Sequence, residues 1–126
     1  MLHFPNPTWP TILDTDASAE GYGAILMQTA PDGKEHVLAY ASKATQPNEK
    51  KWSTTELEAA AVIWALEKFR PYLIDIPFKC RTDHANLKWI RQSDKGRLVR
   101  WALKLDEYDM MLEPRAGTKM PCYDTP

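Results

Sequence analysis

The chain has 126 residues, of which 44% are hydrophobic and 26% charged, so it can form one domain with a core of its own. Five Trp and five Tyr offer ample apolar surface for burial, which excludes wholesale disorder. A formal net charge of −1 excludes a polycationic protein, so a nucleic acid would have to be bound through a local basic face.

The predicted elements begin after residues 1–10, which contain three prolines and are expected to form an extended lead-in. The Pro-Asp-Gly-Lys segment at 31–34 has the composition of a turn, so the second and third predicted strands are expected to form a hairpin. A polar loop is expected at 46–51. The strands predicted along the whole chain are 11–15, 22–29, 36–42, 78–82 and 110–112.

The first predicted helix opens with a capping box, in which Ser53 caps the helix and Glu56 can reach back to the Ser53 amide. This helix is expected to run to about Arg70 and to stop near Pro71. Two more helices are predicted, a short one at 85–91 and a longer one after Gly96. The longer helix presents one face for burial through four apolar residues: Leu98, Trp101, Ala102 and Leu105.

The predicted order is therefore β-β-β-α-β-α-α-β, which indicates an α/β fold with a mixed sheet and helices on its faces. Two cysteines, Cys80 and Cys122, make neither a disulfide framework nor a zinc pattern. A reducing, intracellular setting is therefore expected, with Cys80 as a small buried apolar residue. No apolar stretch of the sequence is long enough to span a bilayer.

Three acids lie where the predicted secondary structure changes: Asp16 and Asp83 end apolar runs, and Glu58 lies near the start of the first helix. Such acids tend to converge at one edge of an α/β sheet, where they repel one another unless a cation lies between them. The sequence therefore predicts a divalent-metal site. The pattern leaves structural explanations open, with Asp16 as a turn residue, Asp83 as a helix N-cap and Glu58 as a favourable charge at a helix N-terminus.

The capping box separates the two glutamates of the first helix. Glu56 has a structural role in the box, whereas Glu58 does not. The neighbours of Glu58 on its helix face are mostly small or apolar, and an acid on such a face needs a partner. This contrast favours Glu58 as the functional residue of the pair.

Basic residues gather on the last two predicted helices: Lys88, Arg91, Lys95, Arg97, Arg100 and Lys104. Such a stripe suits a phosphate backbone, although a solvated helix face is the commoner explanation. His84 either orients a phosphate or is a surface residue at a helix start, and the second interpretation is favoured. No serine has His and Asp partners at a recognisable spacing, so nucleophilic hydrolase chemistry has little support.

Ordered motifs extend over nearly the whole chain, including Thr15-Asp16-Ala17-Ser18, Trp52-Ser53-Thr54-Thr55-Glu56-Leu57-Glu58, Thr82-Asp83-His84-Ala85-Asn86 and Gly96-Arg97-Leu98-Val99-Arg100-Trp101. With these motifs the chain resembles the ribonuclease H domain of gypsy-type LTR retrotransposon Pol polyproteins. Residues 1–10 are similar to the linker from the upstream reverse transcriptase, so the chain is expected to be part of a polyprotein. The ribonuclease H domain is then expected at 11–119, and a degenerate or truncated C-terminal helix at 120–126.

The resemblance implies a ribonuclease H-like fold, a five-stranded mixed sheet with three antiparallel strands, then parallel strands, and flanking helices. It also implies endonucleolytic cleavage of the RNA strand of RNA–DNA hybrids during reverse transcription, with two Mg²⁺ or Mn²⁺ ions. The acidic set of the family maps onto Asp16, Glu58 and Asp83, with Asp16 expected to bridge both ions. The fourth acid, counted seven residues on from Gly117, is Asp124.

The resemblance also implies partners, namely an RNA–DNA hybrid and the reverse transcriptase or connection domain of the same polyprotein, with no membrane. A location in cytoplasmic virus-like particles is expected, with nuclear presence left open. Contacts to the nucleic acid are expected at Ala17, Ser18, His84, Lys88, Arg97 and Arg100.

The segment 120–126 departs from the family, whose usual segment is helical with Ala-Asp-Ala around the acid, whereas this chain has Tyr-Asp-Thr-Pro at 123–126. Pro121 is tolerable at a helix start, but a formed terminal helix is not expected before Pro126. This departure supports an alternative, a catalytically impaired or host-recruited nucleic-acid-binding module with the same fold. A metal-stabilised scaffold that binds no nucleic acid ranks last.

Overall fold

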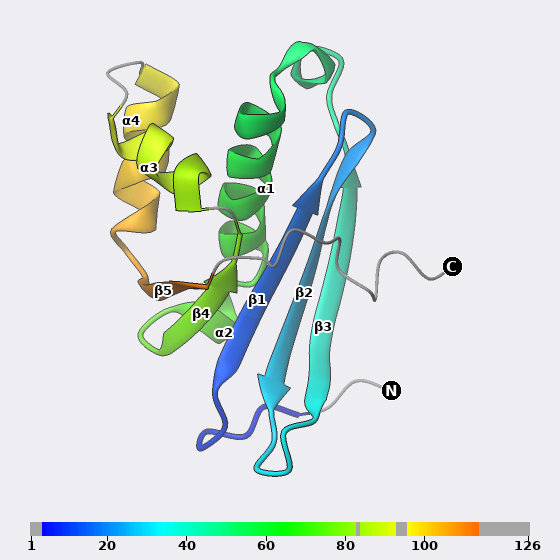
Figure 1. The fold of residues 1–126 in the computed structure, drawn as a ribbon, viewed down its shortest axis with the longest axis vertical. Coiled ribbons are helices and arrows are strands. Elements are labelled where there is room, and N and C mark those ends of the chain that lie inside the picture. Colours follow the sequence, from blue (N-terminus) through cyan, green and yellow to red (C-terminus); the bar gives the residue numbers. More distant parts are fainter. Residues whose placement is uncertain (1–3, 83, 93–95, 114–126) are drawn as a thin grey trace.

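The structure is a computed structural model that describes residues 4–82, 84–92 and 96–113. Its centre is one five-stranded sheet with the strand order β3-β2-β1-β4-β5 (Figure 1). Strands β1, β2 and β3 pair antiparallel, whereas β4 pairs parallel with both β1 and β5. The strands are β1 (Thr11–Ala17), β2 (Gly21–Thr29), β3 (Glu35–Ala44), β4 (Pro77–Arg81) and β5 (Asp109–Glu113).

Helix α1 packs against β1 and β2, and α3 and α4 stand beside α1 on the side away from β2 and β3 (Figure 1). The helices are η1 (Glu49–Lys51), a short 3₁₀ turn, α1 (Thr54–Lys68), α2 (Arg70–Leu73), α3 (His84–Gln92) and α4 (Gly96–Leu105). The predicted mixed α/β sheet and the predicted order of its strands and main helices are thereby confirmed. Within the described residues, no helix is both long and apolar enough to cross a membrane.

Two local predictions differ from the structure. The first helix ends at Lys68, because Phe69 has left helical geometry at φ −104° and ψ 18°. Pro71 therefore does not stop that helix but lies near the start of α2, where a missing N–H costs nothing. The segment expected to be a polar loop at 46–51 contains the 3₁₀ turn η1.

The core fills the space between α1 and the sheet, where Leu13 and Leu26 of the strands meet Val62 and Leu66 of α1. Cys80 is fully buried in the same cluster, as predicted. The predicted apolar face of α4 is confirmed as well, since Leu98 and Leu105 are buried and Trp101 and Ala102 are half-buried and pack against this core. Apolar burial of this kind is the main stabilising contribution of the fold.

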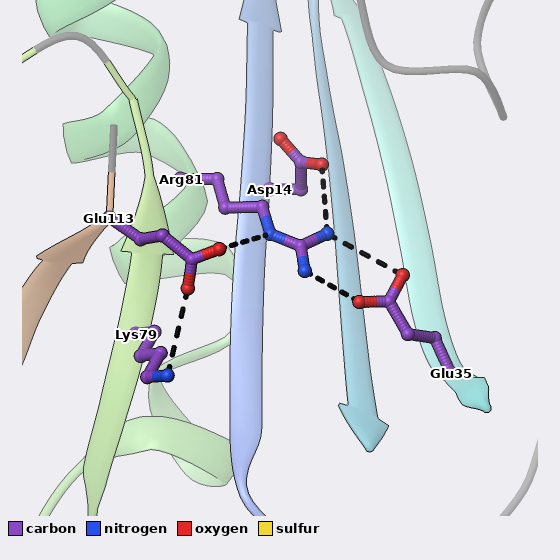
Figure 2. Close-up of polar contacts among 5 residues, drawn as sticks. All are labelled: Asp14, Glu35, Lys79, Arg81 and Glu113. Carbon is purple, nitrogen blue, oxygen red and sulfur yellow. Dashed lines mark hydrogen bonds and ion pairs between the residues drawn. The ribbon is translucent and has the colours of Figure 1, made fainter. Parts of the chain in front are cut away.

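The opposite face of the sheet carries a charged network centred on Arg81 of β4 (Figure 2). Side chains alternate along a strand, so Asp14 points away from the core that contains Leu13. The Arg81 guanidinium lies 2.6 Å from Glu35 Oε2, 3.3 Å from Glu113 Oε1 and 3.9 Å from Asp14 Oδ2. One cation therefore joins charges from β3, β5 and β1 on this face.

The lead-in before β1 is packed onto the sheet rather than extended away from it. The side chain of Gln28 accepts a hydrogen bond from the Asn6 N–H at 2.8 Å and donates one to the Asn6 carbonyl at 2.9 Å. The rings of Trp9 and His36 lie 5.4 Å apart. Residues 6–9 of the predicted linker are therefore held by contacts with β2 and β3.

Candidate active site

Asp16 lies near the end of β1, the central strand of the sheet, where it pairs with Gly23 of β2. The backbone of β1 pairs with β4 from Ile12 to Asp14 and with β2 as far as Ala17, so the position of Asp16 is well defined. The side chain is half-buried, and its Oδ1 accepts a hydrogen bond from the Ala17 N–H at 3.0 Å. Gly23, the partner of Asp16 on β2, contributes no side chain of its own.

Glu58 is placed by the start of α1. The Ser53 hydroxyl accepts a hydrogen bond from the Glu56 N–H at 3.2 Å, and Glu56 Oε1 accepts one from the Ser53 N–H at 3.3 Å. The predicted capping box is therefore confirmed, and with it the structural role of Glu56. Glu58, two residues further along the helix, is half-buried.

Asp16 and Glu58 line the same small pocket, together with Thr15, Ala17 and Thr82. Thr82 follows β4, the parallel neighbour of β1, and directly precedes Asp83 in the sequence. Three elements that are distant in the sequence therefore meet at this pocket. Asp83 and Asp124, the other two predicted site acids, lie outside the described residues.

The chemistry of this pocket suits a hard divalent cation. The lining residues that the structure describes carry oxygen donors and neither sulfur nor imidazole, and Mg²⁺ and Mn²⁺ prefer oxygen ligands. Among the residues that the structure describes, no three His, Cys, Asp or Glu side chains gather into a group that could hold a metal. The described part of the site therefore supplies two carboxylates, which fit an oxygen-ligated ion without completing its ligand set.

A shallow hollow of about 390 Å³ extends from Asp16 over the ends of β1, β2 and β3. Its lining includes Ala17 and Ser18, both predicted to contact nucleic acid. The N–H groups of these two residues are already engaged, since Ala17 donates to Asp16 and Ser18 donates to the Gly21 carbonyl at 2.9 Å. The Ser18 hydroxyl is also engaged, because it accepts a hydrogen bond from the Glu20 N–H at 3.2 Å and donates one to Glu20 Oε2 at 3.4 Å.

The predicted basic stripe contains exposed residues as well as residues that form ion pairs with α1. Lys88 on α3 and Arg100 on α4 are exposed. Arg97, by contrast, places Nη2 2.7 Å from Glu56 Oε2, and Lys104 forms an ion pair with Glu67. Two cations of α4 are therefore used to bind α1. His84, also predicted to contact nucleic acid, is the first residue of α3.

Two tryptophans that the sequence did not single out for the site flank Arg97. The guanidinium carbon of Arg97 lies 4.2 Å from the ring centre of Trp52 and 5.3 Å from that of Trp101. Trp52 directly precedes the N-cap Ser53, a position where an apolar residue often packs against a helix start, and this signal could have drawn attention to it.

Tyr22, at the start of β2, joins this strand to η1 and lines the hollow beside Asp16. Its hydroxyl donates a hydrogen bond to Glu49 Oε2 at 3.0 Å. Burial of the ring, and then the hydrogen bond to Glu49 and its negative charge, raise the pKa of Tyr22 well above the ordinary value. Tyr22 therefore remains a neutral hydrogen-bond donor throughout the physiological pH range.

Residues 6–108 match the family described as "RNase H-like domain found in reverse transcriptase". The chain belongs to this family. This RNase H-like domain is 37% identical over 126 residues to the "Enzymatic polyprotein" of carnation etched ring virus, a match that covers 94% of the chain and 19% of the polyprotein. It is 36% identical over 119 residues to the Pol polyprotein from transposon 412 of Drosophila melanogaster, covering 93% of the chain and 10% of the relative.

Another relative is the Pol polyprotein from transposon opus of Drosophila melanogaster, with 34% identity over 93% of the chain and 12% of the relative. The similarity to these Drosophila transposons confirms the resemblance to gypsy-type elements. The RNase H-like domain spans about a fifth or less of the length of these curated relatives.

Solved structures share the fold of this RNase H-like domain. The foamy viral protease-reverse transcriptase in complex with double-stranded DNA superposes with a TM-score of 0.77 at 15% identity, covering 94% of this chain and 26% of that one. The foamy viral protease-reverse transcriptase in complex with an RNA/DNA hybrid superposes with a TM-score of 0.70 at 16% identity, covering 94% of this chain and 17% of that one. RNase H1 from the archaeon Halobacterium salinarum superposes with a TM-score of 0.52 at 17% identity, covering 86% of each chain. The predicted ribonuclease H-like fold is thereby confirmed.

Proposed function

We propose that this RNase H-like domain cleaves the RNA strand of RNA–DNA hybrids by metal-dependent phosphodiester hydrolysis during reverse transcription. The observation that carries the proposal is the meeting of Asp16 and Glu58 in one pocket whose lining also includes Thr82, the residue before Asp83. Family membership adds support, since the matched family is the RNase H-like domain of reverse transcriptases.

In the proposed site, Asp16, Glu58, Asp83 and Asp124 would hold two Mg²⁺ or Mn²⁺ ions. Bound ions of this kind lower the pKa of an attacking water and stabilise the charge on the leaving oxygen. The contribution of the chain is to fix the carboxylates before the substrate arrives. The central strand fixes Asp16, and the capping box fixes the turn of α1 that precedes Glu58.

The proposed substrate is a hybrid bound along one side of the pocket. Lys88 and Arg100, both exposed, supply positive charge for backbone phosphates from α3 and α4. The hollow beside Asp16 is lined largely by small residues, which allows a sugar-phosphate backbone to approach closely. Hydroxyl and carbonyl groups there suit the 2′-OH groups that distinguish RNA from DNA.

The proposed partner is a reverse transcriptase domain of the same polyprotein. The relatives are polyproteins of which this chain covers 19% or less, so they contain much additional sequence. One relative in structure, the foamy viral protease-reverse transcriptase, was solved in complex with an RNA/DNA hybrid. With a net charge of −1, this domain is expected to rely on such a partner for part of its hybrid affinity.

The test is the substitution Asp16→Asn, which removes the charge of a proposed metal ligand and leaves the side-chain volume almost unchanged. We expect Mn²⁺-dependent cleavage of a labelled RNA–DNA hybrid to fall by about 100-fold or more, with the urea midpoint little changed. The matched control is Asp32→Asn, a change at an exposed turn residue, which should cut at the wild-type rate. A folded Asp16→Asn protein that cleaves as fast as the wild type would disprove the assignment.

The unusual segment 120–126 supports one second candidate, a module that binds the hybrid without cutting it. The same assay separates the two functions. Binding of the wild-type chain to the hybrid without Mn²⁺-dependent cleavage would favour the module, whereas metal-dependent cleavage would favour the nuclease. Absence of any salt-sensitive affinity for the hybrid would contradict both.

A further inference from the structure

Arg97 occupies an unusual setting for a residue on a basic helix. Its guanidinium carbon lies 4.2 Å from the ring centre of Trp52 and 5.3 Å from that of Trp101, and the two ring centres are 6.1 Å apart in an edge-to-face arrangement. Its Nη2 lies 2.7 Å from Glu56 Oε2, while Nε is buried without a hydrogen-bond partner among the described residues. These contacts hold the side chain against the start of α1, although about a third of it (35%) stays exposed.

Glu56 receives contacts from two directions. One carboxylate oxygen accepts hydrogen bonds from the N–H and hydroxyl of Ser53, both at 3.3 Å, and the other oxygen pairs with Arg97. The first contacts close the N-terminus of α1, and the second joins α1 to the start of α4, 41 residues later. Glu56 therefore links the cap of one helix to the position of another.

Glu56 and Glu58 are two residues apart on α1, which places them roughly 200° apart around the helix axis. Glu56 faces Arg97, and Glu58 faces the pocket that contains Asp16. Any rotation of the start of α1 about its axis would therefore move Glu58 within the pocket. An ion pair that fixes Glu56 on one side of the helix fixes Glu58 on the other.

The two tryptophan rings and the end of β1 pack against the same buried side chains. Trp52, Trp101 and Ala17 all pack against the buried cluster formed by Tyr22, Leu57, Ala60 and Ala61. Ala17 directly follows Asp16 and lines the same pocket. Ala17, the neighbour of Asp16, and Leu57, the neighbour of Glu58, thus belong to one group of packed side chains together with both ring partners of Arg97.

We infer that Arg97 is a positioning residue, which acts through Glu56 and the two tryptophans to hold Glu58 ready for a divalent cation. This inference rests on the proposed function and assigns to Arg97 a task other than contact with a nucleic-acid phosphate. A lysine could not replace it, because the planar guanidinium can lie over aromatic rings while its N–H groups pair with a carboxylate.

The test compares Arg97→Gln, Glu56→Gln and the double variant. Glutamine at position 56 can still complete the capping box, so this change removes chiefly the ion pair with Arg97. Both single variants should raise the Mn²⁺ concentration for half-saturation, measured by electron paramagnetic resonance, by about 10-fold, as losses behind a metal ligand commonly do. The double variant should be no worse than either single variant, because both changes break the same link.

The matched control is Glu67→Gln, which breaks the other ion pair between α1 and α4, that with Lys104. It should leave Mn²⁺ affinity unchanged. Hybrid affinity, measured in Ca²⁺ at several salt concentrations, should be the same for all variants and the wild type. Cleavage by Arg97→Gln and Glu56→Gln should fall in kcat rather than rise in KM.

Two results would overturn the inference. If Arg97→Gln alone weakens hybrid binding and reduces the salt slope by about one, Arg97 contacts a phosphate instead. If Arg97→Gln and Glu56→Gln lower only the urea midpoint, as Glu67→Gln does, the ion pair serves stability alone. Failure of the proposed function would look different, because the wild-type chain itself would then neither bind Mn²⁺ nor cut the hybrid.

Discussion

At the scale of single residues, Arg81 is the cation that three carboxylates on one face of the sheet share. Its guanidinium serves Glu35, Glu113 and Asp14 on the face away from α1 (Figure 2). The Asp14 side chain is only 6% exposed, so water compensates poorly for a lost cation there. The hydrogen bond to Glu35, more than any other contact, raises the pKa of Arg81 above its ordinary value, and the group stays charged.

Arg81→Met should therefore destabilise the protein by about 2 kcal/mol, because it leaves three carboxylates without their shared cation. The free energy of unfolding in urea measures this loss. The control is Lys79→Met on the same strand, where an exposed pair with Glu113 at 3.8 Å is expected to contribute less than about 0.5 kcal/mol. Equal losses in the two variants would contradict a special role for Arg81.

At the scale of elements, the pairing of β2 with β3 depends on a close approach at Gly21. A Cβ at this position would lie 2.7 Å from the Lys43 carbonyl oxygen, which belongs to the backbone and cannot turn aside. Gly21→Ala should destabilise the protein by about 2 kcal/mol through this overpacking, as measured by the urea midpoint. Gly96→Ala is the control, because its Cβ would meet only the end of Arg100 at 3.7 Å.

Much at this scale could be predicted from the sequence, since strands and helices follow from local patterns. The capping box at Ser53 and Glu56 and the buried face of α4 needed only neighbouring residues. Asp16 and Glu58 stood out because each lies at a boundary between an apolar run and a polar segment. Arg97 could not be assigned this way, since its partner Glu56 is 41 residues distant and a local pattern shows only a basic helix.

At the scale of the whole molecule, the Arg81 network was equally hidden, because it depends on the order in which the strands assemble. Arg81 of β4 meets Glu35 of β3 although β1 and β2 lie between their strands, so the two long side chains reach across the face of the sheet (Figure 2). No pairing rule read along the chain brings residues 35, 81 and 113 together. The lead-in offers a similar case, since its prolines predicted an extended segment but not its attachment to β2.

That attachment can be tested with Gln28→Leu. Gln28 is buried, and its side chain bonds to both the N–H and the carbonyl of Asn6. The loss of these bonds should cost about 1–2 kcal/mol in urea unfolding and should speed proteolytic cleavage within residues 4–10, followed by mass spectrometry. Gln46→Leu, at an exposed position, should change neither measurement. Unchanged cleavage of the lead-in in Gln28→Leu would show that other contacts hold it.

The central place of β1 also has a consequence for how the protein folds. On one side, β1 pairs with the next strand in the sequence, from Thr11 with Gln28 to Ala17 with Tyr22. On the other side, it pairs with β4, where Ile12 lies opposite Lys79, so a long loop must close first. Contacts between distant residues form slowly, so the hairpins are expected to precede the parallel half of the sheet. Asp16 belongs to β1, the strand that joins the antiparallel and parallel parts of the sheet. The pocket, which also needs Glu58 of α1 and Thr82 after β4, is therefore expected to form only when the parallel part packs against β1.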